Sequence, residues 1–323
     1  MLKSNQNHFV FQSEISDLIN SYTSKREGEL RIGEKLSLNW KDEQVKYVII
    51  GISESIGAQA NLGRKGAEKS FDAFLKSFCN MQLTHVINSS SFACYGKIES
   101  TVDFSEIKES RIWIEELDEF VFSILTPIVK LGKIPIAIGG GHNNAYPLIK
   151  VIRSQDKNIS VINLDAHADC RKLEGRHSGN PFSYALSESL LNKYAVFGLH
   201  KAYNNMEMIH FLEKNNVHFS FFEDYVFGNK NVFNDLNSFL GELNEKDYLG
   251  VELDVDSIAN FPSSAMSPIG FTISDARNYL KKSSSFRNIA YYHLTEAAVI
   301  ENQDERIVGK TLAQFVYDIL SGY

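Results

Sequence analysis

The feature that most constrains the fold of this chain is an alternation of short apolar runs with stretches of helical spacing. Six runs are rich in β-branched residues and apolar along nearly their whole length. Strands of this kind are typical of a parallel sheet whose two faces are both covered by helices. The runs that we predict to be strands are 47–52, 134–138, 159–164, 194–197, 248–253 and 288–294.

The stretches between these runs have the periodicity of amphipathic helices. Near the C-terminus, apolar residues at 312, 315, 316, 319 and 320 form one stripe. A length of 323 residues allows one large domain or two smaller ones, but no Pro/Gly/Ser-rich linker or internal repeat divides the chain. We therefore predict a single doubly wound α/β domain over residues 46–323. Residues 1–45 are polar and mixed in charge, and we expect them to form an N-terminal extension.

Charge and composition exclude several functional classes. The chain has 40 acidic and 33 basic side chains and a net charge of −7, which argues against nucleic acid or an anionic membrane as the main partner. No apolar run approaches the ~20 residues that a membrane-spanning helix needs, and the polar N-terminus lacks a secretory h-region. The 3 cysteines have no CxxC spacing, which suits reduced thiols. We expect a cytoplasmic protein.

Histidine and aspartate residues follow three of the predicted strands, where a parallel sheet binds its ligands. His142 follows strand 134–138 after three glycines, and Asp165, His167 and Asp169 follow strand 159–164. Each motif has an ordinary alternative: an incidental histidine, a helix-capping aspartate, or a solvated acidic pair. A third motif, Asp254 and Asp256 after strand 248–253, makes a shared site the better interpretation.

The residue types of this set favour a metal centre. Carboxylates that converge at one point repel each other and are costly to bury unless a cation neutralises them. Carboxylates and imidazoles without thiolates favour a harder ion such as Mn²⁺ over structural zinc, and several bridging carboxylates suit two ions about 3.5 Å apart. The predicted ligands are His142, Asp165, His167, Asp169, Asp254 and Asp256.

The order of these three motifs on alternating α/β elements resembles the arginase (ureohydrolase) family. The resemblance runs from about Tyr47 to the C-terminus and includes residues 57–67 and Glu296. It implies a three-layer αβα fold around an eight-stranded, mostly parallel sheet. It also implies two Mn²⁺ ions and hydrolysis of a C–N bond in an amidine or guanidine. One ion would be held by His142, Asp165, Asp169 and Asp254, and the other by His167, Asp165, Asp254 and Asp256.

The segment after Asp169 decides the branch of the family that the chain resembles. Arg171, followed by Ser178-Gly179-Asn180-Pro181-Phe182, is similar to the formimidoylglutamase branch, although that branch usually has Thr in place of Asn180. The family also usually has Ser or Thr where Glu252 stands, and often an acidic residue in place of Asn143. Formimidoylglutamate carries two carboxylates, for which an arginine offers a bidentate donor fork. A surface salt bridge is the alternative role for Arg171.

The resemblance also assigns roles in catalysis. Glu296 would receive the cationic amidine nitrogen, with a solvated glutamate as the alternative, and Asp169 would pass a proton to the leaving amine. Arg171, Ser178 and Asn180 would orient the substrate, and Asn61 and Arg64 would reach its other carboxylate. The products of hydrolysing formimidoylglutamate would be L-glutamate and formamide.

Two rival functions stay open from the sequence. The same residues would serve a guanidine hydrolase that releases urea, such as an arginase, an agmatinase or a guanidino-acid hydrolase. A non-catalytic relative that keeps its metals for structure or regulation is the rival of a different class. The family resemblance further implies a homotrimer or homohexamer.

Overall fold

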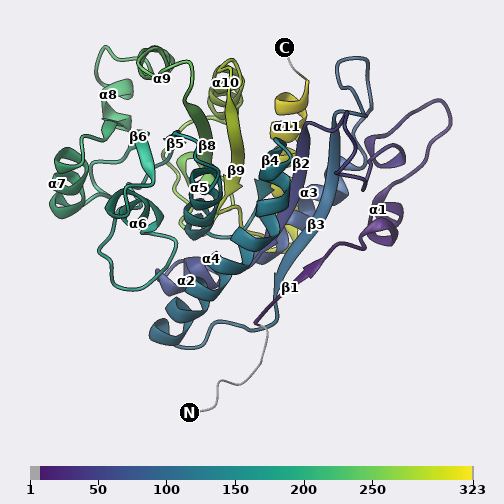
Figure 1. Ribbon diagram of the computed structural model, residues 1–323, viewed down its shortest axis with the longest axis horizontal. Helices are drawn as coiled ribbons and strands as arrows, with labels where there is room; N and C mark the ends of the chain where they lie inside the picture. Colours follow the sequence, from purple (N-terminus) through teal and green to yellow (C-terminus); the bar gives the residue numbers. More distant parts are fainter. Residues whose placement is uncertain (1–7, 322–323) are drawn as a thin grey trace.

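A nine-stranded sheet runs through the middle of the molecule in the computed structural model, which describes residues 8–321 (Figure 1). The strand order is β1-β3-β2-β4-β9-β8-β5-β6-β7. Eight strands pair in parallel, and β1 pairs antiparallel with β3 at one edge. The strands are β1 (Phe9–Gln12), β2 (Tyr47–Ser53), β3 (Phe92–Ser100), β4 (Ile134–Ile138), β5 (Ile159–Leu164), β6 (Leu191–Leu199), β7 (His218–Phe221), β8 (Tyr248–Asp254) and β9 (Ile289–Thr295).

Helices cover both faces of this sheet, so the chain forms three layers. One face packs against α2 (Ile56–Ala60), α4 (Ile107–Lys130), α5 (Ala145–Arg153), α6 (Pro181–Ser187) and α7 (Met206–Lys214). The other packs against α1 (Ser16–Tyr22), α3 (Ser70–Phe78), α9 (Val232–Gly241), α10 (Ile273–Ser283) and α11 (Asn302–Leu320). The short helix α8 (Phe222–Val226) follows β7.

The inner strands are apolar on both sides because they feed two separate hydrophobic cores. In β2, Ile49 packs into the core beneath α3 and α11, whereas Val48 and Ile50 pack into the core beneath α4 and α5. Alternate side chains of a strand point to opposite faces, so burial on both faces requires an unbroken apolar run. The observed layers confirm the predicted αβα class and the mostly parallel sheet, which has nine strands rather than the expected eight because β1 adds an antiparallel strand at one edge.

The strands that the sequence pattern did not indicate lie toward the edges of the sheet. β3 includes Lys97 and Glu99, and β7 has only 4 residues, so neither reads as a long apolar run. Phe9–Gln12, within the expected N-terminal extension, adds strand β1 to the edge, and Ile15 and Ile19 are buried against the body. Residues 1–7, at the start of the predicted extension 1–45, and residues 322–323, at the end of the predicted domain 46–323, lie outside the described residues.

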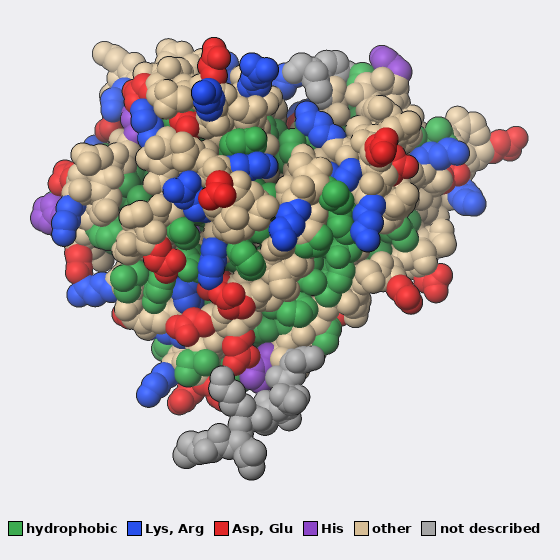
Figure 2. All heavy atoms as spheres, viewed as in Figure 1, with side chains coloured by type: hydrophobic (Ala, Val, Ile, Leu, Met, Phe, Trp, Pro, Cys, Tyr) green, Lys and Arg blue, Asp and Glu red, His purple; other side chains and the backbone are tan. Residues whose placement is uncertain are grey.

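The outer face over α4 and α5 carries acidic and basic side chains that are interspersed rather than gathered by sign (Figure 2). In the described part of the chain, no helix combines the length and the apolar character that crossing a membrane requires.

Candidate metal centre and active site

The four central strands of the sheet end at one place and bring the predicted site residues together. In the order β4-β9-β8-β5, these strands lead into His142, Glu296, Asp254 and Asp165. These four residues come from segments far apart in the sequence, yet all four side chains are at least 97 % buried. The strand order, which differs from the chain order, therefore creates the site.

The first of the two metal-type clusters that the predicted ligands form surrounds the imidazole of His142. A third group that could hold an ion combines His142 with Glu252 and His293. Its Nδ1 atom lies 3.3 Å from Asp165 Oδ2, 2.9 Å from Asp169 Oδ2 and 3.1 Å from Asp254 Oδ2. All four ligand atoms are within 4.8 Å of one another, which suits one shared cation. Three oxygens and one nitrogen are the ligands expected for Mn²⁺.

The second cluster surrounds His167 and shares Asp165 with the first. His167 Nδ1 lies 2.8 Å from Asp256 Oδ2 and 3.8 Å from Asp165 Oδ1. Asp165 thus offers one carboxylate oxygen to each cluster, as a bridging ligand would. The structure brings all six predicted ligands into these two clusters. It groups Asp254 with the first cluster alone, whereas the resemblance implies that Asp254, like Asp165, would bridge both ions.

The same backbone turn orients the carboxylates that end β5 and β8. Asp165 Oδ1 accepts the N–H of His167 at 2.7 Å, and Asp254 Oδ1 accepts the N–H of Asp256 at 2.9 Å. Each bond holds one oxygen of the first aspartate and turns the residue two positions later toward the same point. This explains why an i, i+2 pair at the end of a strand provides two neighbouring ligands.

The electrostatics of these clusters fit a bound cation. The ion pairs of the four aspartates involve only the two imidazoles among the described residues, without lysine or arginine. Burial and the neighbouring Asp169 raise the pKa of Asp165 to about 6, and burial with Asp256 and Asp165 raises that of Asp254. Asp256 Oδ1 is buried without a hydrogen-bond partner. Carboxylates that repel one another in this way have room and charge for a divalent ion.

We call the two clusters of predicted ligands together the metal cradle. Glu296 lies beside it, and both of its carboxylate oxygens accept hydrogen bonds. Its Oε1 accepts the backbone N–H of His142 at 2.6 Å, and its Oε2 accepts the hydroxyl of Ser264. Burial raises the pKa of Glu296 to about 7, although these two hydrogen bonds lower it. The residue has a φ of 64°, in the left-handed region that non-glycine residues seldom adopt. The strand end thus holds this carboxylate in one orientation.

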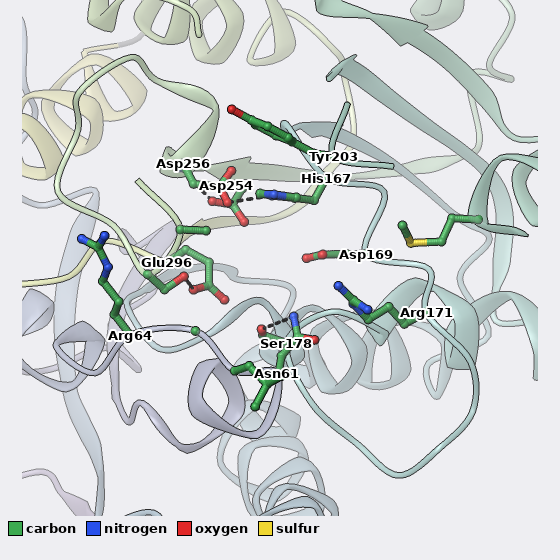
Figure 3. A pocket seen from close by; sticks show the side chains of 15 residues that line it. Asn61, Arg64, His167, Asp169, Arg171, Ser178, Tyr203, Asp254, Asp256 and Glu296 are labelled. Atoms are coloured by element: carbon green, nitrogen blue, oxygen red, sulfur yellow. Dashed lines mark hydrogen bonds and ion pairs between the residues drawn. The ribbon is translucent and has the colours of Figure 1, made fainter. Parts of the chain in front are cut away.

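A pocket opens over the cradle, and its wall carries most of the predicted substrate residues (Figure 3). Asn61 Nδ2 contacts Ser178 Oγ at 3.4 Å. Arg171 points toward Asp169, and Arg64 stands on the opposite side of the pocket. Both arginines are exposed, and neither guanidinium has an ion-pair or hydrogen-bond partner among the described residues. The salt-bridge alternative for Arg171 is therefore absent in this structure.

Asn180 differs from the expectation because its side chain faces the interior of the loop. Its Oδ1 accepts from Arg176 at 2.9 Å and from the N–H of His177 at 3.1 Å. Its Nδ2 donates to the carbonyls of Lys172 and Gly175. These four bonds use the full capacity of the amide, so none is left for a substrate. Asn180 holds the loop that carries Arg171 and Ser178.

Three structural contributors to the site were not indicated by the sequence motifs. Buried Arg176 pairs with Asp118 at 2.8 Å and donates to the Asn143 carbonyl, which ties the loop to the turn that bears His142. Glu54 accepts the N–H groups of Gly57 and Gly141, and Ser264 binds Glu296. Only Glu54 had a sequence signal, because it directly follows β2 at the edge where the ligands lie.

Comparisons with known proteins agree with this fold. A protein-family model described as the arginase family matches residues 45–321 of the chain. A formimidoylglutamase of Macrococcus caseolyticus is 28% identical over 184 residues, which are 56% of this chain and only 55% of the relative. The structure of a Bacillus subtilis formimidoylglutamase superposes with a TM-score of 0.76 at 18% identity and covers 93% of this chain and 94% of that one. A Trypanosoma cruzi formiminoglutamase, solved with Mn²⁺, has a TM-score of 0.70 at 22% identity over 91% and 98% of the two chains.

Proposed function

The chain belongs to the arginase family, and from this premise we propose that it is a manganese-dependent formimidoylglutamase. In this proposal it hydrolyses N-formimidoyl-L-glutamate to L-glutamate and formamide. The observation that carries the proposal is the pair of unpartnered arginines, Arg64 and Arg171, in the wall of a pocket built over six metal-type ligands. A dicarboxylate substrate supplies one anion for each guanidinium.

The metal part of the proposal rests on the donor set. Two Mn²⁺ ions would be held by His142 with Asp165, Asp169 and Asp254, and by His167 with Asp165 and Asp256. When bound, such ions lower the pKa of water and polarise the substrate, so that a nucleophile is available near neutral pH. The similarity to a structure solved with Mn²⁺ supports this choice of ion.

The residues around the cradle bind and orient the substrate in this proposal. The carboxylate of Glu296 lies between the ligand turn and Ser264, where it receives the cationic amidine nitrogen. Arg171 forms a bidentate pair with one substrate carboxylate, and Arg64 pairs with the other. Ser178 helps to orient the substrate, and Asn61 offers its amide to the same carboxylate as Arg64. Asp169, which lines the pocket as well as the first cluster, holds the proton that leaves with the amine.

A substrate panel tests the proposal. The Mn²⁺-loaded protein is incubated with formimidoylglutamate, arginine, agmatine and guanidino acids, and formamide, urea and ammonia are measured separately. We expect formamide and glutamate from the first compound alone. Rapid release of urea from a guanidine would identify the rival guanidine hydrolase. Turnover of none of these compounds would favour the non-catalytic, metal-binding relative.

Assembly and location complete the proposal. The family resemblance supports a homotrimer or homohexamer that acts in the cytoplasm. Light scattering of the purified protein tests the assembly, because a monomer at micromolar concentration would contradict it.

A further inference from the structure

A row of buried polar side chains crosses the sheet one layer beneath the metal cradle. Its members are Asn163 on β5, Glu252 on β8 and His293 on β9, which are direct partners in the register of the three strands. All three are fully buried. Asn163 and Glu252 lie two residues before the ligands Asp165 and Asp254, so in each strand the two side chains point to the same face. We call this set the polar row.

Two members of the polar row, Asn163 and Glu252, contact residues of the first metal cluster. Asn163 Nδ2 donates to Asp165 Oδ2 at 2.9 Å. Glu252 Oε2 lies 3.5 Å from Nε2 of His142, which is buried and has no hydrogen-bond partner. The opposite nitrogen, Nδ1, faces the three carboxylates of the cluster. If Nδ1 is to bind a cation, the proton of the neutral ring must be on Nε2, where Glu252 is the acceptor within reach.

The carboxylate of Glu252 is itself held in place by two donors from β9. Tyr291 donates its hydroxyl to Oε1 at 2.7 Å, and His293 Nδ1 lies 2.6 Å from Oε2. Gly250, the strand partner of Tyr291, leaves room for this ring, since a Cβ there would come within 2.6 Å of it. A carboxylate that is anchored from one side and faces a ligand imidazole on the other has the geometry of an outer-shell partner of a metal ligand.

We infer that Glu252 is a positioning residue for the metal centre: it accepts the Nε2 proton of His142 and so presents Nδ1 to the ion. The inference rests on the metal part of the proposed function and not on its substrate. A purely structural role is the alternative, in which Glu252 only pairs with Tyr291 and His293 in the core. The two roles differ in metal affinity, because outer-shell partners typically change it by about 10–100-fold.

Mn²⁺ binding to three variants tests the inference. The metal-free proteins are titrated with Mn²⁺ by calorimetry and electron paramagnetic resonance, and circular dichroism verifies their fold. For E252Q we expect the affinity for one of the two ions to fall by roughly 10–100-fold. Y291F removes one anchor of Glu252 and should weaken the same ion by a smaller factor.

Y279F is the matched control, because Tyr279 is also a buried tyrosine but donates to the backbone carbonyl of Glu252. We expect it to bind both ions with wild-type affinity. Wild-type affinity in a folded E252Q protein, or equal losses in Y279F and Y291F, would overturn the inference. If E252Q does not fold, wild-type affinity in Y291F overturns it. Failure of the wild-type protein to bind Mn²⁺ would instead refute the proposed metal centre itself.

Discussion

The metal cradle and the substrate wall of this pocket are built in opposite ways. The cradle places carboxylates and imidazoles, four of the six buried, directly at the ends of parallel strands, and hydrogen bonds from the backbone orient Asp165 and Asp254. The wall of the pocket places exposed arginines on loops, where neither guanidinium has an ion-pair or hydrogen-bond partner among residues 8–321. In the proposed function, the strand ends would supply the chemistry and the loops would supply selectivity.

Two arginines of a single loop differ in burial in the same way as the cradle and the wall. Arg176 is 2 % exposed, pairs with Asp118 and stacks on Tyr146, whereas Arg171, five residues earlier, projects into the pocket. Removing one partner of a buried ion pair costs about 3–5 kcal/mol of stability, whereas an exposed arginine contributes little to folding. Arg176 therefore has a structural role, and the proposed function assigns substrate binding to Arg171.

Replacing the shared cradle ligand should have the largest effect. Asp165→Ala removes the carboxylate that both clusters share, so we expect the loss of at least one ion and a fall in activity beyond the roughly 100-fold typical of outer-shell changes. Elemental analysis of the purified variant and a formamide assay measure the two effects. An Asp165→Ala protein with both metals and full activity would refute the site assignment.

Replacing Glu296 should have a smaller effect and leave the metals in place. Glu296→Gln keeps the shape of the side chain but removes the charge that faces the amidine, so we expect kcat/KM to fall by roughly 10²–10³-fold. The Mn²⁺ content should equal that of the wild type, because Glu296 belongs to neither cluster. Loss of metal from this variant would show that Glu296 contributes to metal binding, which would contradict its assignment to the pocket alone.

Replacing Arg171 should have the smallest effect of the three and should alter binding alone. Loss of a charge-assisted hydrogen bond costs about 1.5–3 kcal/mol, so Arg171→Ala should raise KM for formimidoylglutamate by roughly 10–100-fold with little change in kcat or Tm. Lys172→Ala is the control, since it removes the same charge from the neighbouring exposed residue. Equal KM values for the wild type and Arg171→Ala would contradict the carboxylate clamp.

Much of the fold and of the cradle was predictable because both depend on local signals. The inner strands have runs that are apolar along nearly their whole length, and each ligand motif directly follows one of them. The edge elements were less predictable, because charged residues interrupt β3, β7 has only 4 residues, and β1 depends on pairing with β3 and on the packing of Phe9 into a distant part of the core. The role of Asn180 was also out of reach, since its four hydrogen-bond partners become neighbours only when the loop closes.

The sequence by itself determined the layered α/β class, the likeness to the arginase family, and which six side chains have the chemistry of metal ligands. The tertiary structure alone decided that β9 lies between β4 and β8, which puts Glu296 beside His142 and Glu252 behind it. It also decided which arginine is buried and which is left for a ligand. The physical reason is that apolar periodicity and strand-end motifs are local, whereas strand order and the pairing of buried charges depend on contacts between distant segments.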